Sequence, residues 1–222
     1  MLTPHYFTAQ RGGADLPLHY FTCGIIDPGW HWATRSDKGR GKSRQYTCSP
    51  IDELLALPVG ELFAPVAAVA LWNTQYANGR SWHARLLEGW GFEPQTTGAW
   101  LKLTANGKPF FGLGKILRSC VEFYTIGTRG HPSPQSRSVR NFITAPWRGE
   151  SVKPDELYVD MEQLYGGPAV GPCVELFARQ HYPGWHGWGN ELIPNEEPSS
   201  LTPPGKPEPC SARSRLIIHV KL

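Results

Sequence analysis

The stretch YFTCGIIDPGW, residues 20–30, determines how the rest of the sequence is interpreted. Its first seven residues, 20–26, are mostly β-branched or aromatic and predict a buried strand. Asp27, Pro28 and Gly29 then stop the strand with a turn, which places a carboxylate at its end. In open α/β sheets, ligands bind outside the carboxyl ends of the strands. The segment therefore predicts an α/β domain with a polar site directly after this strand.

Downstream of this segment, apolar runs alternate with helical patterns. Further strands are predicted at residues 66–72, 97–103, 121–126 and 173–178. Three helices are predicted. The first starts with Ser49 as N-cap and Pro50 at the first helical position, the second spans residues 81–90, and the third starts near Lys153. Strands that alternate with helices indicate a Rossmann-like α/β fold, a mixed and mostly parallel sheet with helices on both faces.

The composition changes near the carboxyl terminus. From about residue 194 the chain is rich in Pro, Ser, Glu and Lys and poor in hydrophobic residues, which predicts a flexible tail. The final apolar run, residues 216–222, is a candidate for an extra edge strand. The expected organisation is one folded domain over residues 1–193 and a tail over residues 194–222, as suits a chain of 222 residues.

Several classes of protein are disfavoured by composition. No run approaches the roughly 18 apolar residues of a membrane-spanning helix, and residues 1–15 lack the pattern of a signal peptide. The five cysteines are scattered and never spaced as C-x-x-C, and the eight histidines show no H-x-x-x-H spacing. These patterns argue against a disulfide framework or a metal site and fit a reducing compartment. We therefore expect a cytoplasmic protein with no metal ion and no membrane contact.

The net charge of +3 conceals an uneven distribution of charge. Residues 35–44 carry five basic side chains and one acid, and residues 102–140 carry seven basic side chains and one acid, Glu122. Residues 150–197 reverse the balance, with nine acids and two basic side chains. A basic part beside an acidic part suggests one face for a polyanion such as a nucleic acid. Ordinary solvated surface loops would give the same pattern, so charge alone does not decide.

Asp27, the carbonyl of Pro28 and the ring of Trp30 provide three chemical groups within four residues. A carboxylate and a rigid backbone carbonyl can together accept both hydrogens of an exocyclic amine and orient it for methylation. An aromatic ring can stack on the base that carries this amine, which contributes about 1–3 kcal/mol per base. The alternative is an ordinary Pro-Gly turn between a surface Asp and a core Trp.

The strand followed by D-P-x-W resembles the catalytic motif of the MT-A70 family of adenine methyltransferases, usually written DPPW. Further segments are similar to family motifs in the same order: YTCS (46–49), LW (71–72), GWGF (89–92), WLKLT (100–104), GTRG (127–130), KPDELY (153–158), ELFAR (175–179) and WHGWGNE (185–191). Because the motifs occur in order, the chain is identified as a member of this family.

The resemblance implies a class I methyltransferase fold with a permuted motif order, over the predicted domain of residues 1–193. It implies transfer of a methyl group from S-adenosylmethionine to the N6 amine of adenine in DNA. The expected catalytic residues are Asp27, Pro28, Gly29 and Trp30. The expected donor-binding residues are Asp27, Lys153, Glu175, Arg179, Asn190 and Glu191. The expected nucleic-acid-binding residues are Tyr46, Arg40, Lys42 and Arg44.

Within this set the resemblance suggests individual roles. Lys153 would bind the carboxylate of the donor, and Asp27 its amino end as well as the target amine. Arg179, Asn190 and Glu191 would hold its ribose and adenine, with Glu175 orienting Arg179. Glu122 is expected to be structural.

One departure and two alternatives accompany this interpretation. Gly29 stands where the family usually has Pro, which frees Pro28 from the restriction that a following Pro imposes. DNA is favoured over RNA because the chain shows no accessory RNA-binding module, like stand-alone members from prokaryotes or phages, which act in the prokaryotic or phage-infected cytosol. The alternatives are an RNA adenine-N6 methyltransferase and a catalytically silent, nucleic-acid-binding member of the family. The recognition sequence and the oligomeric state stay open.

Overall fold

The computed structural model describes residues 16–30, 49–112, 116–149, 152–189 and 192. Within them, one seven-stranded sheet has the strand order β5-β3-β4-β2-β1-β6-β7. The strands are β1 (Phe21–Ile26), β2 (Phe63–Asn73), β3 (Glu93–Leu103), β4 (Val121–Arg129), β5 (Phe142–Pro146), β6 (Cys173–Leu176) and β7 (Trp185–Trp188). β4 is antiparallel to β2 and β3, and the other neighbouring pairs are parallel. This mixed, mostly parallel sheet confirms the predicted fold class.

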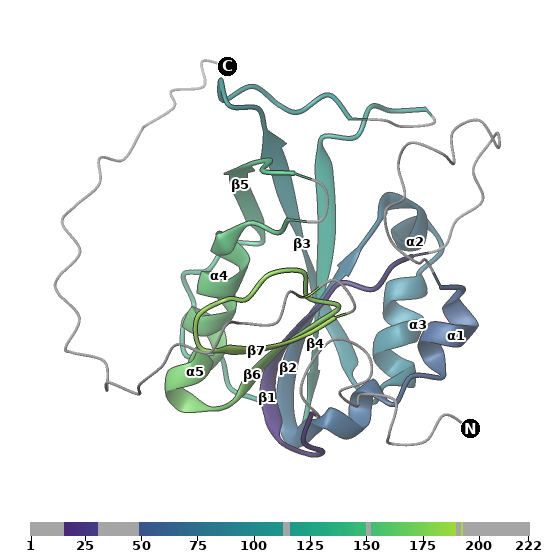
Figure 1. The fold of residues 1–222 in the computed structure, drawn as a ribbon, viewed down its shortest axis with the longest axis vertical. Helices are drawn as coiled ribbons and strands as arrows, with labels where there is room; N and C mark the ends of the chain where they lie inside the picture. The colour runs from purple at the N-terminus through teal and green to yellow at the C-terminus, as the bar shows by residue number, and fades with distance from the viewer. Residues whose placement is uncertain (1–15, 31–48, 113–115, 150–151, 190–191, 193–222) are drawn as a thin grey trace, which may run out of the picture.

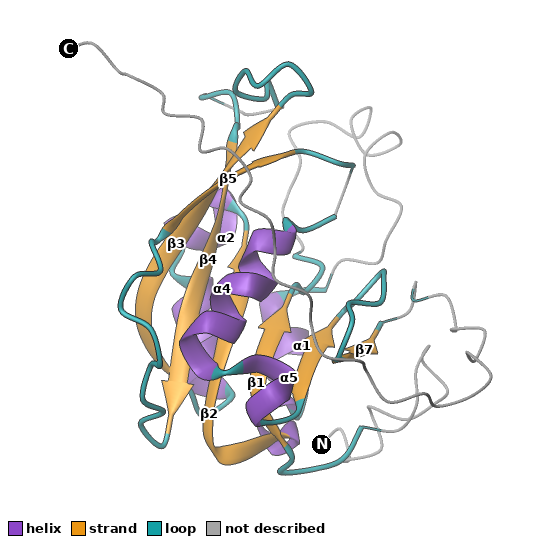
Figure 2. Cartoon of the chain, turned by 90° about the vertical axis from the view of Figure 1, so that its left-hand side faces the viewer, coloured by secondary structure: helices purple, strands orange, loops and turns teal. Residues whose placement is uncertain are grey.

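Helices cover both faces of the sheet (Figures 1 and 2). One face carries α1 (Ile51–Leu55), α2 (Gln75–Gly79) and α3 (Trp82–Gly89), and the other carries α4 (Asp155–Tyr165) and α5 (Gly167–Val170). A 3-10 helix, η4 (Val59–Leu62), precedes β2. None of the helices in the described part of the chain is long and apolar enough to cross a membrane.

β1 lies in the interior of the sheet and is buried on both faces. Its neighbouring residues Ile25 and Ile26 join different core clusters, because successive side chains of a strand point to opposite faces. Ile25 lies opposite Ala70 of β2 and Glu175 of β6. The strand order changes direction at β1, so the border between β1 and β6 is the topological switch point where α/β sheets form their ligand crevice.

The start of α1 differs from the prediction. Ser49 was expected as its N-cap, but the helix begins at Ile51 with Pro50 as N-cap, so that prediction is wrong by one residue. The reason is that Ser49 pairs with the chain after β1: its N–H donates to the Gly29 carbonyl at 2.8 Å, and it forms a parallel bridge with Trp30. This pairing holds Ser49 to the chain after β1, and Pro50 stands between it and the first helical residue.

Other differences concern element length. β2 and β3 extend beyond their predicted apolar runs, and the short elements α2, α5, β5 and β7 were not predicted. Four or five residues are too few to show a periodic pattern. The predicted tail of residues 194–222, with its candidate edge strand, lies outside the described residues.

Candidate active site

Asp27 and Lys153 are brought together at the carboxyl end of β1. The Asp27 N–H donates to the Leu176 carbonyl of β6 at 3.3 Å, which extends the strand pairing by one residue. The Asp27 carboxylate forms an ion pair with Lys153 Nζ; the Lys153 side chain is 6 % exposed and that of Asp27 20 %. Two predicted site residues from distant parts of the sequence therefore form one nearly buried charge pair.

The segment before α4 holds Lys153 in place. Pro154 is the N-cap of α4 in extended geometry, so Lys153 lies immediately outside the helix. Arg148 donates to the Lys153 carbonyl at 2.7 Å and to both carboxylate oxygens of Asp155 at 2.7 and 2.9 Å. Lys153 Nζ also lies 5.2 Å from the centre of the Trp72 ring, a cation–π contact. Arg148 thus positions the lysine, although it lies outside every motif in the sequence.

Glu175 is the second buried carboxyl group at this site. It lies on β6 opposite Ile25. Burial raises its pKa to about 7. The nearby Tyr158 hydroxyl and the charge of Lys153 lower this pKa, and the charge of Asp27 raises it further. The Tyr158 hydroxyl and the Glu175 carboxyl group are near neighbours, and each shifts the pKa of the other. They form a buried polar pair beside Asp27 and Lys153.

The pKa of Asp27 is also raised, and the causes identify its electrostatic neighbours. Burial raises it most, and Lys153 opposes this through its charge and a hydrogen bond. The charge of Glu122 on β4 raises the pKa further, and the charge of Arg179 lowers it. Arg179 therefore lies within electrostatic reach of Asp27, and its role toward the donor stays a prediction.

Glu122 is a site neighbour that sequence reasoning treated as structural. It pairs with Lys102 Nζ at 2.9 Å, and the Lys102 ammonium lies 5.9 Å from the Trp100 ring and 5.5 Å from the Phe110 ring. The signal available in the sequence was that Glu122 is the single acid in a basic segment. Its charge still acts on Asp27, so the pair belongs to the electrostatics of the site.

The remaining residues of the D-P-x-W segment have structural contacts. Trp30 is buried at 3 % exposure in the core cluster and donates its ring N–H to the Trp72 carbonyl at 3.1 Å. Pro28 is buried and Gly29 half-buried. Because the Trp30 ring packs in the core, its role in stacking on a base stays a prediction. The other predicted residues, Arg40, Lys42, Arg44, Tyr46, Asn190 and Glu191, lie outside the described residues.

Two of the motifs stabilise the fold. Arg129, from the GTRG segment, donates to the carbonyls of Gly60, Phe63 and Ala64 before and at the start of β2. Trp90, from the GWGF segment, donates its ring N–H to the Leu54 carbonyl of α1 at 3.1 Å. These contacts satisfy buried backbone carbonyls and need no ligand.

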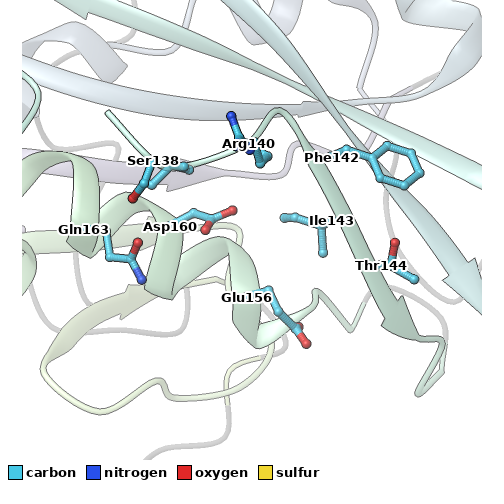
Figure 3. A pocket seen from close by; sticks show the side chains of 9 residues that line it. Ser138, Arg140, Phe142, Ile143, Thr144, Glu156, Asp160 and Gln163 are labelled. Carbon is cyan, nitrogen blue, oxygen red and sulfur yellow. The ribbon is translucent and has the colours of Figure 1, made fainter. Parts of the chain in front are cut away.

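A separate pocket of about 290 Å³ lies between α4 and the segment at the start of β5 (Figure 3). Arg140 and Phe142 line it from the β5 side, and Glu156 and Asp160 line it from α4. Burial, and secondarily the charge of Glu156, raise the pKa of Asp160. None of the site residues described above lines this pocket, and its two acids make it a poor surface for phosphate groups.

A mixed sheet with this strand order, and a charged pair at the carboxyl end of its interior strand, has the architecture of a Rossmann-like methyltransferase. The sequence profile of the MT-A70 family matches residues 21–191. The chain belongs to the MT-A70 family.

Three of the proteins to which this chain is similar are named as methyltransferases. The N(6)-adenine-specific methyltransferase METTL4 of Mus musculus is 25 % identical over 184 residues, which cover 76 % of this chain and 37 % of the relative. The N6-methyladenosine RNA methyltransferase MTA1 of Cryphonectria parasitica is 28 % identical over 203 residues, covering 85 % and 56 %. The type II methyltransferase M.MunI of Mycoplasma sp. is 30 % identical over 204 residues, covering 82 % of each chain. The chain thus spans less than two thirds of the length of the first two relatives.

Replacing Glu175 with Gln is expected to stabilise the protein at pH 8 but hardly at pH 5. The native carboxyl group binds its proton more tightly than the unfolded one, because its pKa is raised from an ordinary 4.5 to about 7. Wild-type stability therefore falls as pH rises through this window, by roughly 3 kcal/mol at most. Urea unfolding of both proteins at pH 5 and pH 8 measures the difference.

The matched control is Glu88→Gln, at an exposed position on α3. It should change the free energy of unfolding by less than about 0.5 kcal/mol at either pH, as is usual for surface substitutions. If Glu175→Gln has the same effect at pH 5 as at pH 8, Glu175 does not ionise in this window and the assignment of its pKa is wrong.

Proposed function

We propose that this protein transfers a methyl group from S-adenosylmethionine to the N6 amine of adenine in a nucleic acid, with DNA as the substrate. The observation that carries the proposal is the nearly buried pair of Asp27 and Lys153 at the carboxyl end of β1, in a chain of the MT-A70 family. A catalytically silent binding protein would not need to keep such a pair, because burying two charges costs several kcal/mol per ion before their attraction is counted.

The residues at the site fit the methyl donor. Bound S-adenosylmethionine supplies an electrophilic methyl group on a sulfonium sulfur. In our proposal, the Lys153 ammonium binds the carboxylate of the donor's amino-acid end, and Asp27 faces its amino group. Glu175 and Tyr158 form a buried polar pair beside them. Arg179, Asn190 and Glu191 hold the ribose and the adenine of the donor.

Asp27 and Pro28 orient the target amine. The amine of adenine is a weak nucleophile because its lone pair is delocalised into the ring. The Asp27 carboxylate and the Pro28 carbonyl each accept one hydrogen of the amine and direct its lone pair toward the methyl group. As the new N–C bond forms, the bond between the methyl group and the sulfur breaks and leaves its electron pair on the sulfur. Positive charge develops on the nitrogen, and the adjacent carboxylate stabilises it. The raised pKa of Asp27 also brings this group closer to the range in which it can accept the surplus proton.

RNA is the second candidate substrate, because the relative named as an RNA methyltransferase, MTA1, aligns with 85 % of this chain. We also propose that the methyltransferase domain comprises residues 1–193 and that residues 194–222 form a flexible tail; the family match, which ends at residue 191, supports this division. We also propose a cytoplasmic location in a prokaryotic or phage-infected cell; the scattered cysteines support only the reducing compartment.

The experiment that tests the proposal is a direct product analysis. Purified protein is incubated with methyl-labelled S-adenosylmethionine and with DNA or RNA, the polymer is digested, and the labelled nucleoside is identified. Label in N6-methyldeoxyadenosine from DNA is the expected result. Label in N6-methyladenosine alone would select RNA, and no labelled adenine nucleoside from either polymer would refute the proposed activity.

Replacing Gly29 with Pro is expected to leave turnover unchanged or to raise it. Among the described glycines, those with positive φ do not include Gly29, and the residue pairs with Ser49 through its carbonyl. Pro at this position would restrict Pro28 to extended geometry and hold its carbonyl in place. Compatible replacements of this kind also stabilise by about 0.4–1 kcal/mol. The measurement is turnover at saturating donor and nucleic acid.

The control for this substitution is Gly29→Ala, which reduces the freedom of the unfolded chain without restricting Pro28. A gain for Pro but not for Ala would assign the effect to the Pro28 carbonyl. A tenfold loss of turnover in Gly29→Pro, with normal melting, would mean that the site does not follow the DPPW geometry.

A further inference from the structure

One edge of the sheet is formed by β5, which pairs with β3 alone in the described part of the chain (Figure 1). On the side of β3, the Trp147 N–H that follows β5 donates to the Leu103 carbonyl at 2.8 Å. Because the backbone groups of successive residues point to opposite sides of a strand, those of Phe142 and Thr144 point away from β3. Their N–H groups and carbonyls form an edge that can pair with one more strand.

This edge has two chemically different sides (Figure 3). On one side Ile143 points toward α4, and the pocket of about 290 Å³ lies between the strand and the helix. Glu156 and Asp160 line this pocket from α4, and Arg140 is the one basic residue among those that line it. On the other side of the strand, Phe142 is 52 % exposed. A strand bound to this edge would therefore meet carboxylates on one face and an exposed ring on the other.

The chain itself contains a segment whose sequence fits both sides. Residues 213–222, which lie outside the described residues, read RSRLIIHVKL and contain no acid. From residue 216 onward every second residue is apolar, which would give a strand one wholly apolar face: Leu216, Ile218, Val220 and Leu222. The opposite face would carry His219 and Lys221. The apolar face suits the exposed ring, and the basic face suits the acids of α4.

The chain is long enough to bring this segment to β5. Leu192, the last described residue, lies just after β7, where its N–H donates to the Gly189 carbonyl at 3.3 Å. β7 and β5 form opposite edges of the sheet, six strand spacings or about 29 Å apart. The linker of 23 residues, 193–215, can span up to roughly 75 Å when extended. The segment can therefore reach the β5 edge of its own molecule, with slack for a path around the sheet.

We propose that residues 216–222 bind along the free edge of β5 as an added strand of the same molecule. Their backbone pairs with that of Phe142 and Thr144, as in other cases of strand addition to a sheet edge. The face with His219 and Lys221 meets the acids of α4. Pairing of two copies through β5 is disfavoured, because it would place the acids of both α4 helices side by side. The flexible part of the proposed tail is then limited to the linker. This inference goes beyond methyl transfer and does not rest on it.

The first test is amide hydrogen exchange of the full chain, measured by NMR in wild type and in Val220→Asp, which places a carboxylate on the apolar face. The amides of residues 216–222 and the outward amides of Phe142 and Thr144 should exchange at least about tenfold more slowly in wild type. The matched control, Ala212→Asp, adds the same charge within the linker and should exchange like wild type. Equal exchange in wild type and in Val220→Asp would overturn the inference.

The second test exchanges charges across the proposed contact. Asp160→Lys and Lys221→Glu should each speed the exchange of residues 216–222 by about 1.5- to 5-fold, the range for one exposed ion pair. The double variant should return toward wild type, because it restores opposite charges in reversed positions. Glu88→Lys, at an exposed position on α3, is the control and should have no effect. If the effects of the two single variants simply add in the double variant, the two faces do not meet and the inference is wrong.

A third measurement separates binding within one molecule from binding between molecules. A fluorescein-labelled peptide with the sequence of residues 213–222 should bind Val220→Asp at least about fivefold more tightly than wild type. In wild type the tethered segment already occupies the edge, at an effective concentration near millimolar. Wild type should sediment as a monomer. A wild-type dimer that dissociates in Val220→Asp would assign the segment to the edge of another copy and overturn the inference. Absent methylation by wild type would refute only the proposed function and leave these results unchanged.

Discussion

Replacing Asp27 with Asn is expected to reduce methyl transfer at least about 100-fold, the usual effect of removing one electrostatic partner of a transition state. Asn keeps the size of the side chain and one acceptor oxygen, but it loses the negative charge that stabilises the developing charge on the amine. The readout is label incorporated into nucleic acid under single-turnover conditions, where donor and product binding do not limit the rate.

The same substitution is also expected to destabilise the protein. Lys153 is nearly buried, and without Asp27 its charge would lack the partner that now neutralises it. Removing one partner of a buried pair costs on the order of 3 kcal/mol. A control must therefore separate loss of chemistry from loss of folding.

The control is the double variant Asp27→Asn with Lys153→Met, in which both charges are absent and the apolar stem is retained. We expect its melting temperature to return close to that of wild type while transfer stays undetectable. Near wild-type turnover in Asp27→Asn would show that this carboxylate is not catalytic.

Replacing Lys153 alone with Met is expected to weaken binding of S-adenosylmethionine by about 10- to 150-fold, as for loss of a hydrogen bond to a charged group. It should also change the pH dependence of transfer. Burial raises the pKa of Asp27, and Lys153 lowers it through its charge and a hydrogen bond. Without the lysine, the pKa of Asp27 should therefore rise further. In the proposed reaction Asp27 must be ionised to accept the amine hydrogen, so we expect activity to be lost as pH falls through its pKa. The acid limb of kcat/KM should therefore move to higher pH.

Lys153→Arg is the matched variant, because it keeps the positive charge and changes its shape. Its acid limb should stay nearer to that of wild type even if donor affinity falls. An acid limb that is identical in wild type and in Lys153→Met would mean that Asp27 ionisation does not control the reaction.

Much of the fold was predictable because its strands are continuous apolar runs. β1, the interior part of β2 and β6 are buried on both faces, and that burial is what such runs indicate. The antiparallel direction of β4 could not be predicted, because its apolar run has no feature that encodes direction. The short strands β5 and β7 pair at the edges, where their position depends on the neighbouring strand rather than on their own four or five residues.

The proximity of Asp27, Lys153 and Glu175 was predictable, because chemistry and motif coincide at these positions. Arg148 was missed because its function is to hold a backbone carbonyl, and an isolated arginine gives no signal for that. The residues of the motifs have different kinds of contact. Arg129 and Trp90 donate hydrogen bonds to backbone carbonyls of the fold, whereas Lys153 forms an ion pair with Asp27. Matching letters in a sequence thus mark positions under constraint without stating whether the constraint is packing or catalysis.

The pairing of β1 with β6 has a consequence for how the protein is made. Cys23 lies opposite Cys173, so the interior strand that leads to Asp27 gains its second neighbour only from a segment far along the chain. During synthesis that apolar strand has one unpaired edge, which is a template for aggregation. Contacts of such sequence separation also slow folding, because a long loop must close before they form. Asp27 emerges from the ribosome long before Lys153 and Glu175, so the candidate site can assemble only after these two residues have followed it.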